Sequence, residues 1–424
     1  MRNRSKPRVL YIVYWGAAEP LGQSLVLPAV KRLAAMGVDL TLVTFDKPAD
    51  LGRLEEIGRI RESLDEAGVQ WMPLRYHKSP KVPATAYDIA QGCARAIAAR
   101  VRSRFEVVHA RTFIGGLMGL LLAPILGAKL IYHNEGFYPD EQVDAGVWQA
   151  GSRAHRIAKR LEQEMYARAD AIIALSHRAK AEIENFPKIA RKATPVIVVP
   201  SCVDLNHFGF NPAETYRREK TLRFVYSGSV GGRYMLDRIG RFVAIASKEN
   251  RVHLRVLTRT SPDLIGSILN GSGLRDGAWS VDSVAFTDMP QQLASNDAGL
   301  CFLTQGISEH GCSSTKIGEY WAAGLPVITT PNVSDTDEII RREHVGVVLN
   351  EHTDDGYARA AAELRALLED DQLSMRCRQA AEAHYALEPA CERQASLYHR
   401  FSHDSRTTSL NECSAANVTS ERKQ

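Results

Sequence analysis

The chain has 424 residues, too many for one ordinary hydrophobic core, so we expect two domains of roughly 200 residues each. Hydrophobic residues make up 45% of it and charged residues 24%, which excludes a fibrous protein or one disordered throughout. The net charge of +4 is uneven, since residues 1–205 carry +8 and residues 206–424 carry −4, so the first half indicates either an anionic partner or only a solvated surface.

The cysteines and the apolar segments predict a cytoplasmic protein. Seven cysteines stand far apart without a C-x-x-C pair, which argues against a disulfide framework and against a zinc site. The basic start of the chain leads into a short strand, and the longest apolar run, residues 114–128, is interrupted by Pro124 and is shorter than the ~20 residues of a membrane span. Association with the inner face of the membrane stays open, because the first half is basic.

Strands and helices alternate along the first half of the chain. Continuous apolar runs predict strands that are buried on both faces, and the stretches between them predict helices. The predicted strands are residues 8–14, 38–44, 107–110, 129–133, 171–175 and 196–199, and the predicted helices are 24–36, 114–127 and 152–168. This alternation predicts right-handed βαβ units and a parallel sheet.

The second half restarts the same alternation. Its predicted strands are residues 222–227, 253–257, 297–303 and 325–329, and its predicted helices are 235–247 and 315–323. We therefore predict a first domain over residues 1–205, a second domain over 206–404 whose last helix packs back on the first, and a disordered tail over 405–424. Two such sheets bind a nucleotide or another anionic ligand in the cleft at their strand ends.

The segment with the clearest chemistry is residues 306–330, which reads loop, helix, glycine and strand. Ser313, Ser314 and Thr315 stand at the helix start, where free N–H groups and the helix dipole favour an anion. Lys316 adds a positive charge, and Glu319 lies one turn further on, where its carboxylate can accept hydrogen bonds from ribose hydroxyls. The alternative is a capped surface helix with an ion pair between these two charged residues.

A glycine-containing turn, residues 228–233, follows the first strand of the second half. Gly228 and Ser229 would let the backbone approach a diphosphate, and Arg233 can neutralise it. Arg255 and Arg259, at and after the next strand, are further candidate phosphate ligands. An ordinary strand–helix turn is the alternative, and the pattern is neither G-x-G-x-x-G nor a P-loop, which disfavours a dehydrogenase or a kinase.

Several segments together resemble family 4 glycosyltransferases. Residues 313–328 (SSTKIGEYWAAGLPVI) are similar to the donor-site motif of that family, in which Glu319 matches the second of two glutamates. Weaker similarities lie at residues 107–111 (VVHAR), 132–136 (YHNEG), 171–176 (AIIALS), 198–208 (VVPSCVDLNHF) and 226–234 (YSGSVGGRY). The resemblance covers residues 8–400 and implies the GT-B fold, an α/β architecture of two facing Rossmann-like domains with parallel sheets and an inter-domain cleft.

The first glutamate of the family motif has no clean counterpart. Its position holds Gly311, and the nearest carboxylate upstream is Glu309. Either Glu309 replaces it through a longer loop, or the chain belongs to the branch whose loop reads Ser-Pro-Thr-Lys, which we favour. The resemblance also implies metal-independent transfer with retention of the anomeric configuration.

The candidate catalytic residues follow strand ends of the first half. The resemblance places His133 beside the transferred sugar, where it can polarise a hydroxyl or stabilise departing charge, and a structural histidine is the alternative. Glu135, with Asp140 and Glu141 in the same loop, is a candidate to orient or deprotonate the acceptor hydroxyl. Arg111, at the end of the preceding strand, is a candidate to bind an anionic group of donor or acceptor.

We therefore predict a hexosyltransferase that moves a sugar from a nucleoside-diphosphate sugar to a hydroxyl of a glycan or lipid-linked glycan, in polysaccharide or glycoconjugate biosynthesis. The alternatives are a GT-B nucleotide-sugar epimerase and a non-catalytic nucleotide-sugar-binding protein. We expect no cofactor beyond the co-substrate, no metal and no nucleic acid. Contact with an anionic membrane is expected through two predicted helices, one carrying Arg95, Arg100, Arg102 and Arg104 and the other Arg153, Arg156, Lys159 and Arg160.

Overall fold

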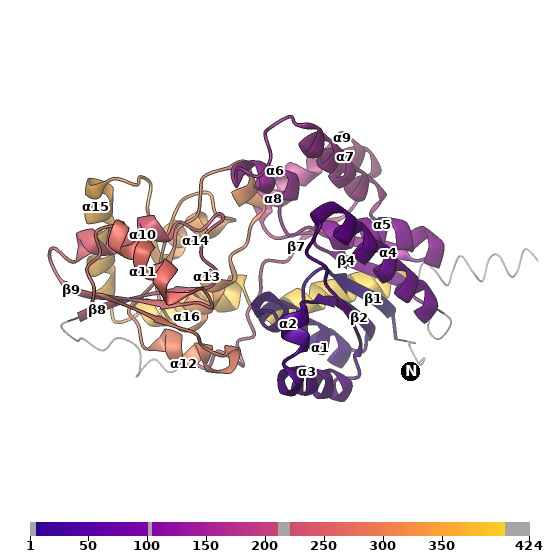
Figure 1. Cartoon of the computed structure of the whole chain (residues 1–424), viewed down its shortest axis with the longest axis horizontal. Coiled ribbons are helices and arrows are strands. Elements are labelled where there is room, and N and C mark those ends of the chain that lie inside the picture. Colours follow the sequence, from indigo (N-terminus) through magenta and orange to yellow (C-terminus); the bar gives the residue numbers. More distant parts are fainter. Residues whose placement is uncertain (1–5, 101–103, 211–220, 403–424) are drawn as a thin grey trace, which may run out of the picture.

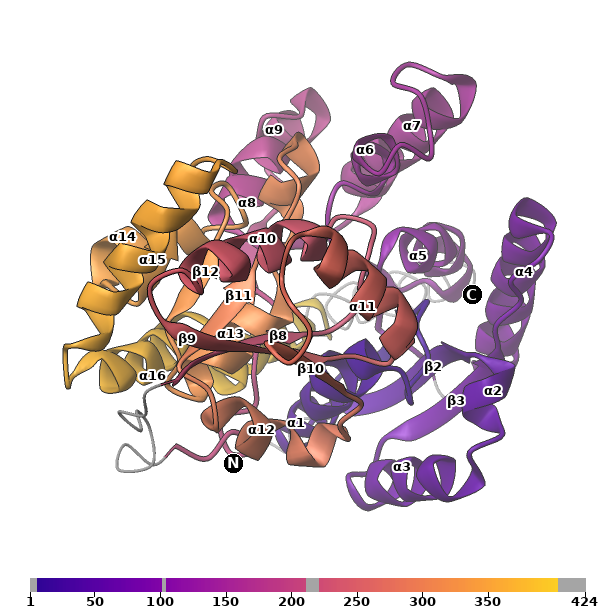
Figure 2. The ribbon, with the colours of Figure 1, turned by 60° about the vertical axis from the view of Figure 1, so that its left-hand side comes forward.

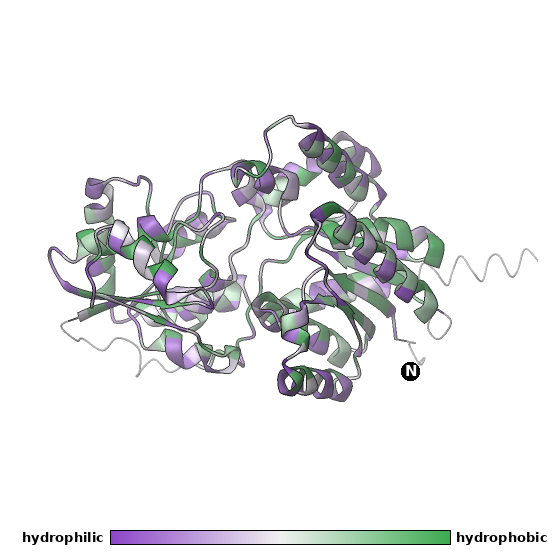
Figure 3. Ribbon diagram, viewed as in Figure 1, coloured by the Kyte–Doolittle hydropathy of each residue, from purple (hydrophilic) through white to green (hydrophobic). Residues whose placement is uncertain are grey.

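The chain forms two α/β lobes, which are joined by a linker and by one helix that returns to the first lobe (Figure 1). The computed structural model describes residues 6–100, 104–210 and 221–402. In each lobe a sheet lies in the middle with helices on both sides, and the strands are among the most hydrophobic parts (Figure 3).

Domain 1 contains a seven-stranded parallel sheet in the order β3-β2-β1-β4-β5-β6-β7. The strands are β1 (Arg8–Val13), β2 (Asp39–Asp46), β3 (Gln70–Arg75), β4 (Val107–Arg111), β5 (Lys129–His133), β6 (Ala171–Ala174) and β7 (Val196–Val198). Most central strands are buried along almost their whole length, because helices cover both faces. The strand order reverses between β1 and β4, and ligands of such sheets bind at this point.

The helices of domain 1 connect successive parallel strands. They are α1 (Leu27–Ala35), α2 (Pro48–Leu51), α3 (Leu54–Glu66), α4 (Lys81–Ala99), α5 (Phe113–Leu126), α6 (Tyr138–Asp144), α7 (Arg153–Arg168), α8 (His177–Glu184) and α9 (Pro187–Lys192). A π-helical turn, η1 (Gly22–Val26), precedes α1. The longest apolar run of the sequence is α5, which packs on β4, α4 and α7, and no helix of the described residues is both long enough and apolar enough to cross a membrane.

Domain 2 contains a six-stranded parallel sheet in the order β10-β9-β8-β11-β12-β13. The strands are β8 (Thr221–Ser227), β9 (Arg251–Leu257), β10 (Trp279–Asp282), β11 (Ala298–Cys301), β12 (Val327–Thr329) and β13 (Gly346–Val348). One face of the sheet is covered by α10 (Leu236–Ala246), α11 (Pro262–Gly271) and α15 (Asp354–Leu368). The other face is covered by α12 (Met289–Ala294), α13 (Thr315–Ala322), α14 (Thr336–Glu343) and α16 (Leu373–His384), as Figure 2 shows from the side of domain 2.

The chain crosses between the domains twice, and the two crossings are hydrogen-bonded to each other. In the linker after β7, the N–H of Val203 donates to the carbonyl of Tyr385 at 2.7 Å, and the N–H of Leu387 donates to the carbonyl of Val203 at 3.1 Å. Residues 387–402 then form a helix that lies against domain 1 (Figure 1). The side chains that this helix adds to the core of β1 and β2 are Ala390, Cys391, Ala395, Leu397, Tyr398 and Phe401.

The predicted fold class is confirmed, and every predicted strand is present with its ends within about two residues. The prediction of one arginine-bearing helix through residue 104 is wrong. Helix α4 ends at Ala99, Arg100 follows it with its guanidinium donating to the carbonyl of Ile125 at 2.8 Å, and Arg104 lies beyond the helix. Arg102 and the predicted tail at 405–424 lie outside the described residues.

Candidate active site

The carboxyl ends of the two sheets meet at a cavity of about 350 Å³ between the domains. Its walls come from the loop after β1, the start of α5 and the loop between β5 and α6 in domain 1, and from the loop after β8 and the start of α13 in domain 2. Its lining includes Tyr14, Trp15 and Glu135 from domain 1 and Arg233, Ser314 and Thr315 from domain 2. Both switch points of strand order therefore open into one space.

The loop between β11 and α13 docks directly on domain 1. The Ser308 hydroxyl donates to Asp144 Oδ2 at 2.5 Å, and the Ser176 hydroxyl donates to the carbonyl of His310 at 2.5 Å. These bonds join α6 and the start of α8 to the short helical turn η4 (Ile307–Gly311). They hold the two domains together on one side of the cavity.

The start of α13 forms one wall of the cavity. Ser314 is the N-cap and Thr315 the first helical residue, and both line the cavity. Ser313 is held by the linker, because Ser201 donates its N–H to Ser313 Oγ at 3.0 Å and its hydroxyl to the Ser313 carbonyl at 2.7 Å. Ser314 makes no capping hydrogen bond with its side chain. The N–H of Ile317 donates to the Ser314 carbonyl at 3.1 Å, so the N–H groups of Thr315 and Lys316 are those that could meet an anion.

The rest of α13 is buried, so the alternative of a surface helix is wrong. Lys316 is 4% exposed and Glu319 is 9% exposed. Distant parts of the chain cover this helix: a Cβ placed on Gly318 would lie 2.8 Å from the side chain of Val203 and 3.0 Å from that of Tyr385. The polar residues of α13 therefore sit in the protein interior, where unpaired charge is expensive.

The ammonium group of Lys316 lies among aromatic rings. Its Nζ is 3.5 Å from the ring centroid of Tyr234 and 5.2 Å from that of Tyr226, within the range of cation–π contacts. Gly228, whose φ is 118°, leaves room beside it, since a Cβ there would lie 3.4 Å from Nζ. Within the described part of the chain no carboxylate forms an ion pair with Lys316, which suits a site for a bound anion.

The carboxyl group of Glu319 lies one turn further along α13. Burial raises its pKa from 4.5 to about 7, and the charge of Lys316 opposes this rise. From the residues that the structure describes, this carboxyl group receives no hydrogen bond. Its capacity to accept hydrogen bonds is therefore free for a ligand.

Arg233, in the loop after β8, is paired across the domain interface. Its Nη2 lies 2.8 Å from Glu141 Oε1, and its Nη1 lies 3.6 Å from Glu309 Oε2. Burial raises the pKa of Glu309 to about 7, and Arg233 opposes this rise. Ser229, earlier in the same loop, is exposed, and its carbonyl accepts from the Tyr226 hydroxyl.

Gly311, where the family motif has its first glutamate, packs tightly against domain 1. A Cβ at this position would lie 3.0 Å from the ring of Phe137 and 3.1 Å from Cα of Gly136. A glutamate side chain would need the loop to move. The carboxylate nearest in sequence, Glu309, lies at Arg233 instead.

Arg111 and Glu135 form a buried ion pair on the domain 1 side of the cavity. The Nε of Arg111 donates to Glu135 Oε1, and its Nη1 donates to the Tyr11 hydroxyl at 3.3 Å. Burial raises the pKa of Glu135, and Arg111 opposes this rise. Arg111 is 4% exposed and already engaged, so it does not offer its charge to a ligand, whereas Glu135 lines the cavity.

His133 does not open into the cavity, contrary to the prediction from its strand-end position. The ring is 1% exposed, with Nδ1 at 3.0 Å from His109 Nε2 and Nε2 at 3.4 Å from Glu135 Oε1. Burial and the charge of Arg111 hold the pKa of His133 well below 6.5, so the imidazole is neutral. Glu135 is therefore the group of this cluster that a ligand in the cavity would meet.

Comparison with known families finds a match in the first domain. Residues 24–207 match the model of Glycosyltransferase Family 4. The first domain is therefore similar to that family over these residues. Comparison of the sequence with curated proteins finds no match.

Solved structures show the same fold over nearly the whole chain. Sucrose-phosphate synthase from Thermosynechococcus elongatus is similar with a TM-score of 0.69 at 14% identity, over 94% of this chain and 100% of that one. HepE from Anabaena, solved with UDP and glucose, gives 0.62 at 12% identity over 92% and 99%. WaaG, a glycosyltransferase involved in lipopolysaccharide biosynthesis, gives 0.59 at 16% identity over 92% and 99%. The protein thus has the GT-B fold.

Three other candidate residues lie outside the cavity. Asp140 turns towards α7, where Lys159 Nζ lies 2.7 Å from its Oδ2. Arg255 is paired with Asp282 at 2.8 Å. Arg259 is exposed just beyond the carboxyl end of β9, on the cleft side of the sheet but not among the lining residues.

Two residues of the site carry no local signal in the sequence. Trp15 lines the cavity and stacks its ring at 5.4 Å from the guanidinium of Arg111. Tyr398, from the helix at residues 387–402, places its hydroxyl 2.6 Å from His109 Nδ1. Both contacts depend on pairings that only the tertiary fold creates.

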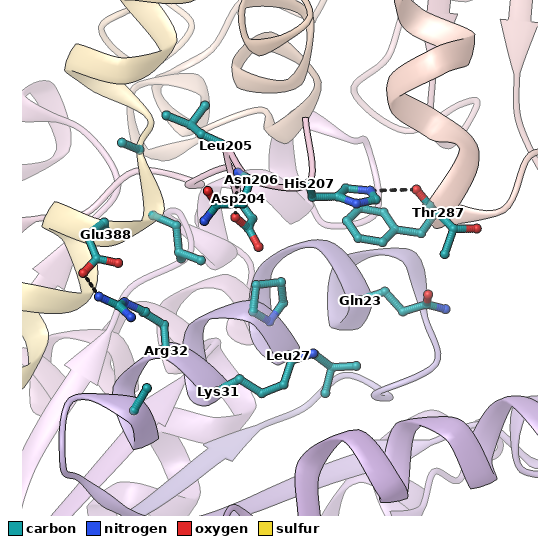
Figure 4. Close-up of a pocket in the computed structure, with 15 residues that line it drawn as sticks. Gln23, Leu27, Lys31, Arg32, Asp204, Leu205, Asn206, His207, Thr287 and Glu388 are labelled. Atoms are coloured by element: carbon teal, nitrogen blue, oxygen red, sulfur yellow. Dashed lines mark hydrogen bonds and ion pairs between the residues drawn. The ribbon is translucent and has the colours of Figure 1, made fainter. Parts of the chain in front are cut away.

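A larger groove, of about 770 Å³, lies beside the linker between the domains, and α1 and the segment after β10 form its other walls (Figure 4). Arg32 of α1 is paired with Glu388 across one end of it. At the other end His207 stacks on Phe286 at 4.4 Å and bonds its carbonyl at 2.9 Å. The groove therefore borders the linker between the two domains.

No group of three or more metal-ligating side chains occurs in the ranges that the structure describes. The positive groups next to the cavity are instead those of Lys316 and Arg233.

Proposed function

We propose that the protein transfers a hexose unit, with retention of configuration, from a nucleoside-diphosphate sugar to a hydroxyl of a glycan or lipid-linked glycan. Domain 2 would bind the donor and domain 1 the acceptor. The observation that carries this proposal is the buried ammonium of Lys316, which has no carboxylate partner among the described residues and lies in the first turn of α13. A diphosphate supplies the charge that this place lacks.

The donor would extend from this point along α13. Glu319, whose carboxyl group receives no hydrogen bond from the described residues, would bind the ribose hydroxyls. Gly228 and Ser229 would allow the diphosphate to approach the backbone, and Lys316 would stabilise the negative charge that grows as the sugar leaves. HepE, a similar structure, was solved with UDP and with UDP-glucose, which supports uridine nucleotides as the first donors to test.

Arg233 would take part only after a rearrangement. It is bound to Glu141 of domain 1, so a diphosphate must compete with that carboxylate for the guanidinium. Glu309 beside it carries a pKa of about 7 and is poised to lose its charge when a second anion arrives. Donor binding would thus be coupled to the contact between the domains.

The acceptor would lie against the domain 1 wall. Tyr14, Trp15, Phe113 and Tyr138 give this wall an aromatic surface, which suits the apolar faces of sugar rings. Glu135 and Glu141 are both on this wall, and because Glu141 is paired with Arg233, Glu135 would orient the attacking hydroxyl. The involvement of a glycan or lipid-linked glycan, and of polysaccharide or glycoconjugate biosynthesis, rests on the family resemblance.

Helix α7 supports contact of domain 1 with an anionic membrane from the cytoplasmic side. Arg153, Arg156 and Arg160 are exposed on it, and Ile157 between them is 57% exposed. Lys159 of the predicted basic group points inward to Asp140 and Glu162 and would not take part. Basic and apolar side chains on one helix face suit a headgroup surface.

The function is tested by release of nucleoside diphosphate. The protein is mixed with UDP-sugars and oligosaccharide acceptors, and free UDP is measured with and without the acceptor. Release that depends on the acceptor supports transfer, and NMR of the product then shows whether the anomeric configuration is retained. Conversion of the donor without acceptor would instead identify an epimerase, and UDP-sugar binding without turnover over a wide acceptor panel would identify a non-catalytic binding protein.

A further inference from the structure

The start of α8, in domain 1, is capped by a side chain of domain 2. The N–H of His177 donates to Asp335 Oδ2 at 2.7 Å, and the N–H of Arg178 donates to Asp335 Oδ1 at 3.3 Å. Asp335 directly precedes α14 but makes no capping hydrogen bond to that helix. The first N–H groups of a helix have no acceptor within it, so those of α8 depend on the contact between the domains.

The guanidinium of Arg178 extends the same contact to the first turn of α14. Its Nη2 donates to Glu338 Oε1 at 2.8 Å and to Asp337 Oδ2 at 3.3 Å. The side chain of Arg178 is 20% exposed and that of Glu338 is 62% exposed, so water and salt reach this pairing. Ion pairs of this kind are individually weak, which allows the contact to open.

The loop before α14 has an unusual backbone where it meets α8. Asn332 has a φ of 62° and Ser334 a φ of 52°, the left-handed region that residues other than glycine rarely adopt. The loop is held by Arg178, whose Nη1 donates to Asn332 Oδ1 at 3.4 Å, and by η4, where the Glu309 carbonyl accepts from the N–H of Ser334 at 3.1 Å. Since Ser176 is also bonded to η4, the start of α8 contacts the loops on both sides of α13. Strained backbone that depends on such contacts is typical of segments that rearrange.

We propose that Arg178 is the central residue of a latch that holds the two domains together at the rim of the cavity. The latch consists of residues 176–178 with Asp335, Asp337 and Glu338. It lies at the rim because Leu175, at the end of β6, lines the cavity. Its effect on turnover rests on the proposed function, in which closure brings a donor on domain 2 to an acceptor on domain 1. The latch itself is a property of the protein alone.

The first experiment measures hydrogen exchange by NMR in the full chain, without any substrate. The amide of His177 reports the latch, and that of Ala179 is the reference, because it donates to Ser176 Oγ at 2.8 Å within domain 1. The amide of Ser308 reports a second contact between the domains, since it donates to Asp144 Oδ2 at 3.4 Å. Arg178→Gln should lower the protection of His177 and of Ser308 about fivefold, the effect of one lost hydrogen bond between charged groups, and leave Ala179 unchanged.

The matched control is Arg341→Gln, which removes the same charge from the same carboxylate. Arg341 Nη1 donates to Asp337 Oδ2 at 3.0 Å, but both residues belong to α14. This variant should keep the parent protection of all three amides. An equal loss of protection in the control, or a loss at His177 with no change at Ser308, would overturn the proposal, because the latter result means that the helix start frays while the domains stay together.

Glu338→Gln removes the partner of Arg178 on the other domain and keeps the proposal testable if Arg178→Gln disturbs α8. Glu338 is largely exposed, so this change should not affect folding. Alone it should also lower the protection of His177 and Ser308. Combined with Arg178→Gln it should add little, because the two changes break one contact, and additive losses would contradict a direct pairing.

Turnover gives a separate readout. We expect kcat of Arg178→Gln to fall about two- to fivefold with the affinity for UDP unchanged in calorimetry, since the donor would lie on domain 2, whereas Arg341→Gln should keep the parent kcat. Unchanged protection of His177 in Arg178→Gln would overturn the latch whatever the turnover. If neither parent nor variants transfer sugar but the protection changes as expected, the proposed function fails and the latch stands.

Discussion

Glu319→Gln should change two properties of the protein in opposite directions. The carboxyl group is 9% exposed and its pKa is about 7 instead of 4.5. Each pKa unit corresponds to about 1.4 kcal/mol, so ionising this group in the folded protein costs on the order of 3 kcal/mol at high pH. The amide has a similar shape and no charge, so the variant avoids this cost.

The raised pKa of Glu319 determines how the free energy of unfolding changes with pH. A group with a raised folded-state pKa stabilises the folded state at low pH relative to high pH, and that stability is lost as the pH rises through about 7. The free energy of unfolding of the parent should therefore fall by about 1 kcal/mol more than that of Glu319→Gln between about pH 6 and about pH 8. The measurement is urea unfolding at both pH values.

The affinity for UDP should fall in Glu319→Gln, whereas its stability at high pH should rise. An amide replaces the charged acceptor for the ribose hydroxyls, so affinity for UDP should drop by about one to two decades, measured by calorimetry. Glu363→Gln, an exposed glutamate on α15, is the control and should change neither property. If Glu319→Gln binds UDP like the parent, the ribose role of Glu319 is refuted. If the two proteins show the same pH dependence of unfolding, the reasoning from burial is refuted instead.

Three further predictions concern charge. Lys316→Met should retain the free energy of unfolding within about 1 kcal/mol, because the thioether suits the rings of Tyr226 and Tyr234. Its kcat should fall at least about 100-fold, and turnover like that of the parent would count against the diphosphate site. Turnover should survive excess EDTA, and a loss that manganese or magnesium specifically restores would contradict a metal-independent site. Binding to vesicles with anionic lipid should weaken with salt and with Arg156→Gln and Arg160→Gln on α7, and salt-independent co-sedimentation would argue against this surface.

The strands and the hydroxyl-rich start of α13 could be predicted because their signals are local. Buried strands such as β1 and β5 are continuous apolar runs, and the start of α13 gathers hydroxyl residues beside a lysine. The edge strand β3 (Gln70–Arg75) was not predicted, because only Trp71 and Leu74 of it are buried and it includes Pro73. Local pattern was therefore sufficient for the centre of each sheet and weaker at its edges.

The burial of Lys316 and Glu319 could not be predicted from α13 itself. The sequence suggests one apolar face, whereas Gly318 is also covered by Val203 and Tyr385, and Lys316 lies against the rings of Tyr226 and Tyr234, all distant in the chain. The same holds for the bond between His109 and Tyr398, which are 289 residues apart. Side chains that act through such pairings are visible only once the chain has folded.

The helix at residues 387–402 also determines the order in which the protein can be completed during synthesis. Domain 1 precedes domain 2 on the ribosome, but its core around β1 and β2 includes Tyr398 and Phe401, which are translated after the whole of domain 2. Until they arrive, the face that β1, β2 and the neighbouring β4, the strand of His109 and Arg111, present to this helix lacks its cover. A nascent chain that stops before residue 387 should therefore expose this face to chaperones, although every domain 1 residue of the cavity wall has already been made.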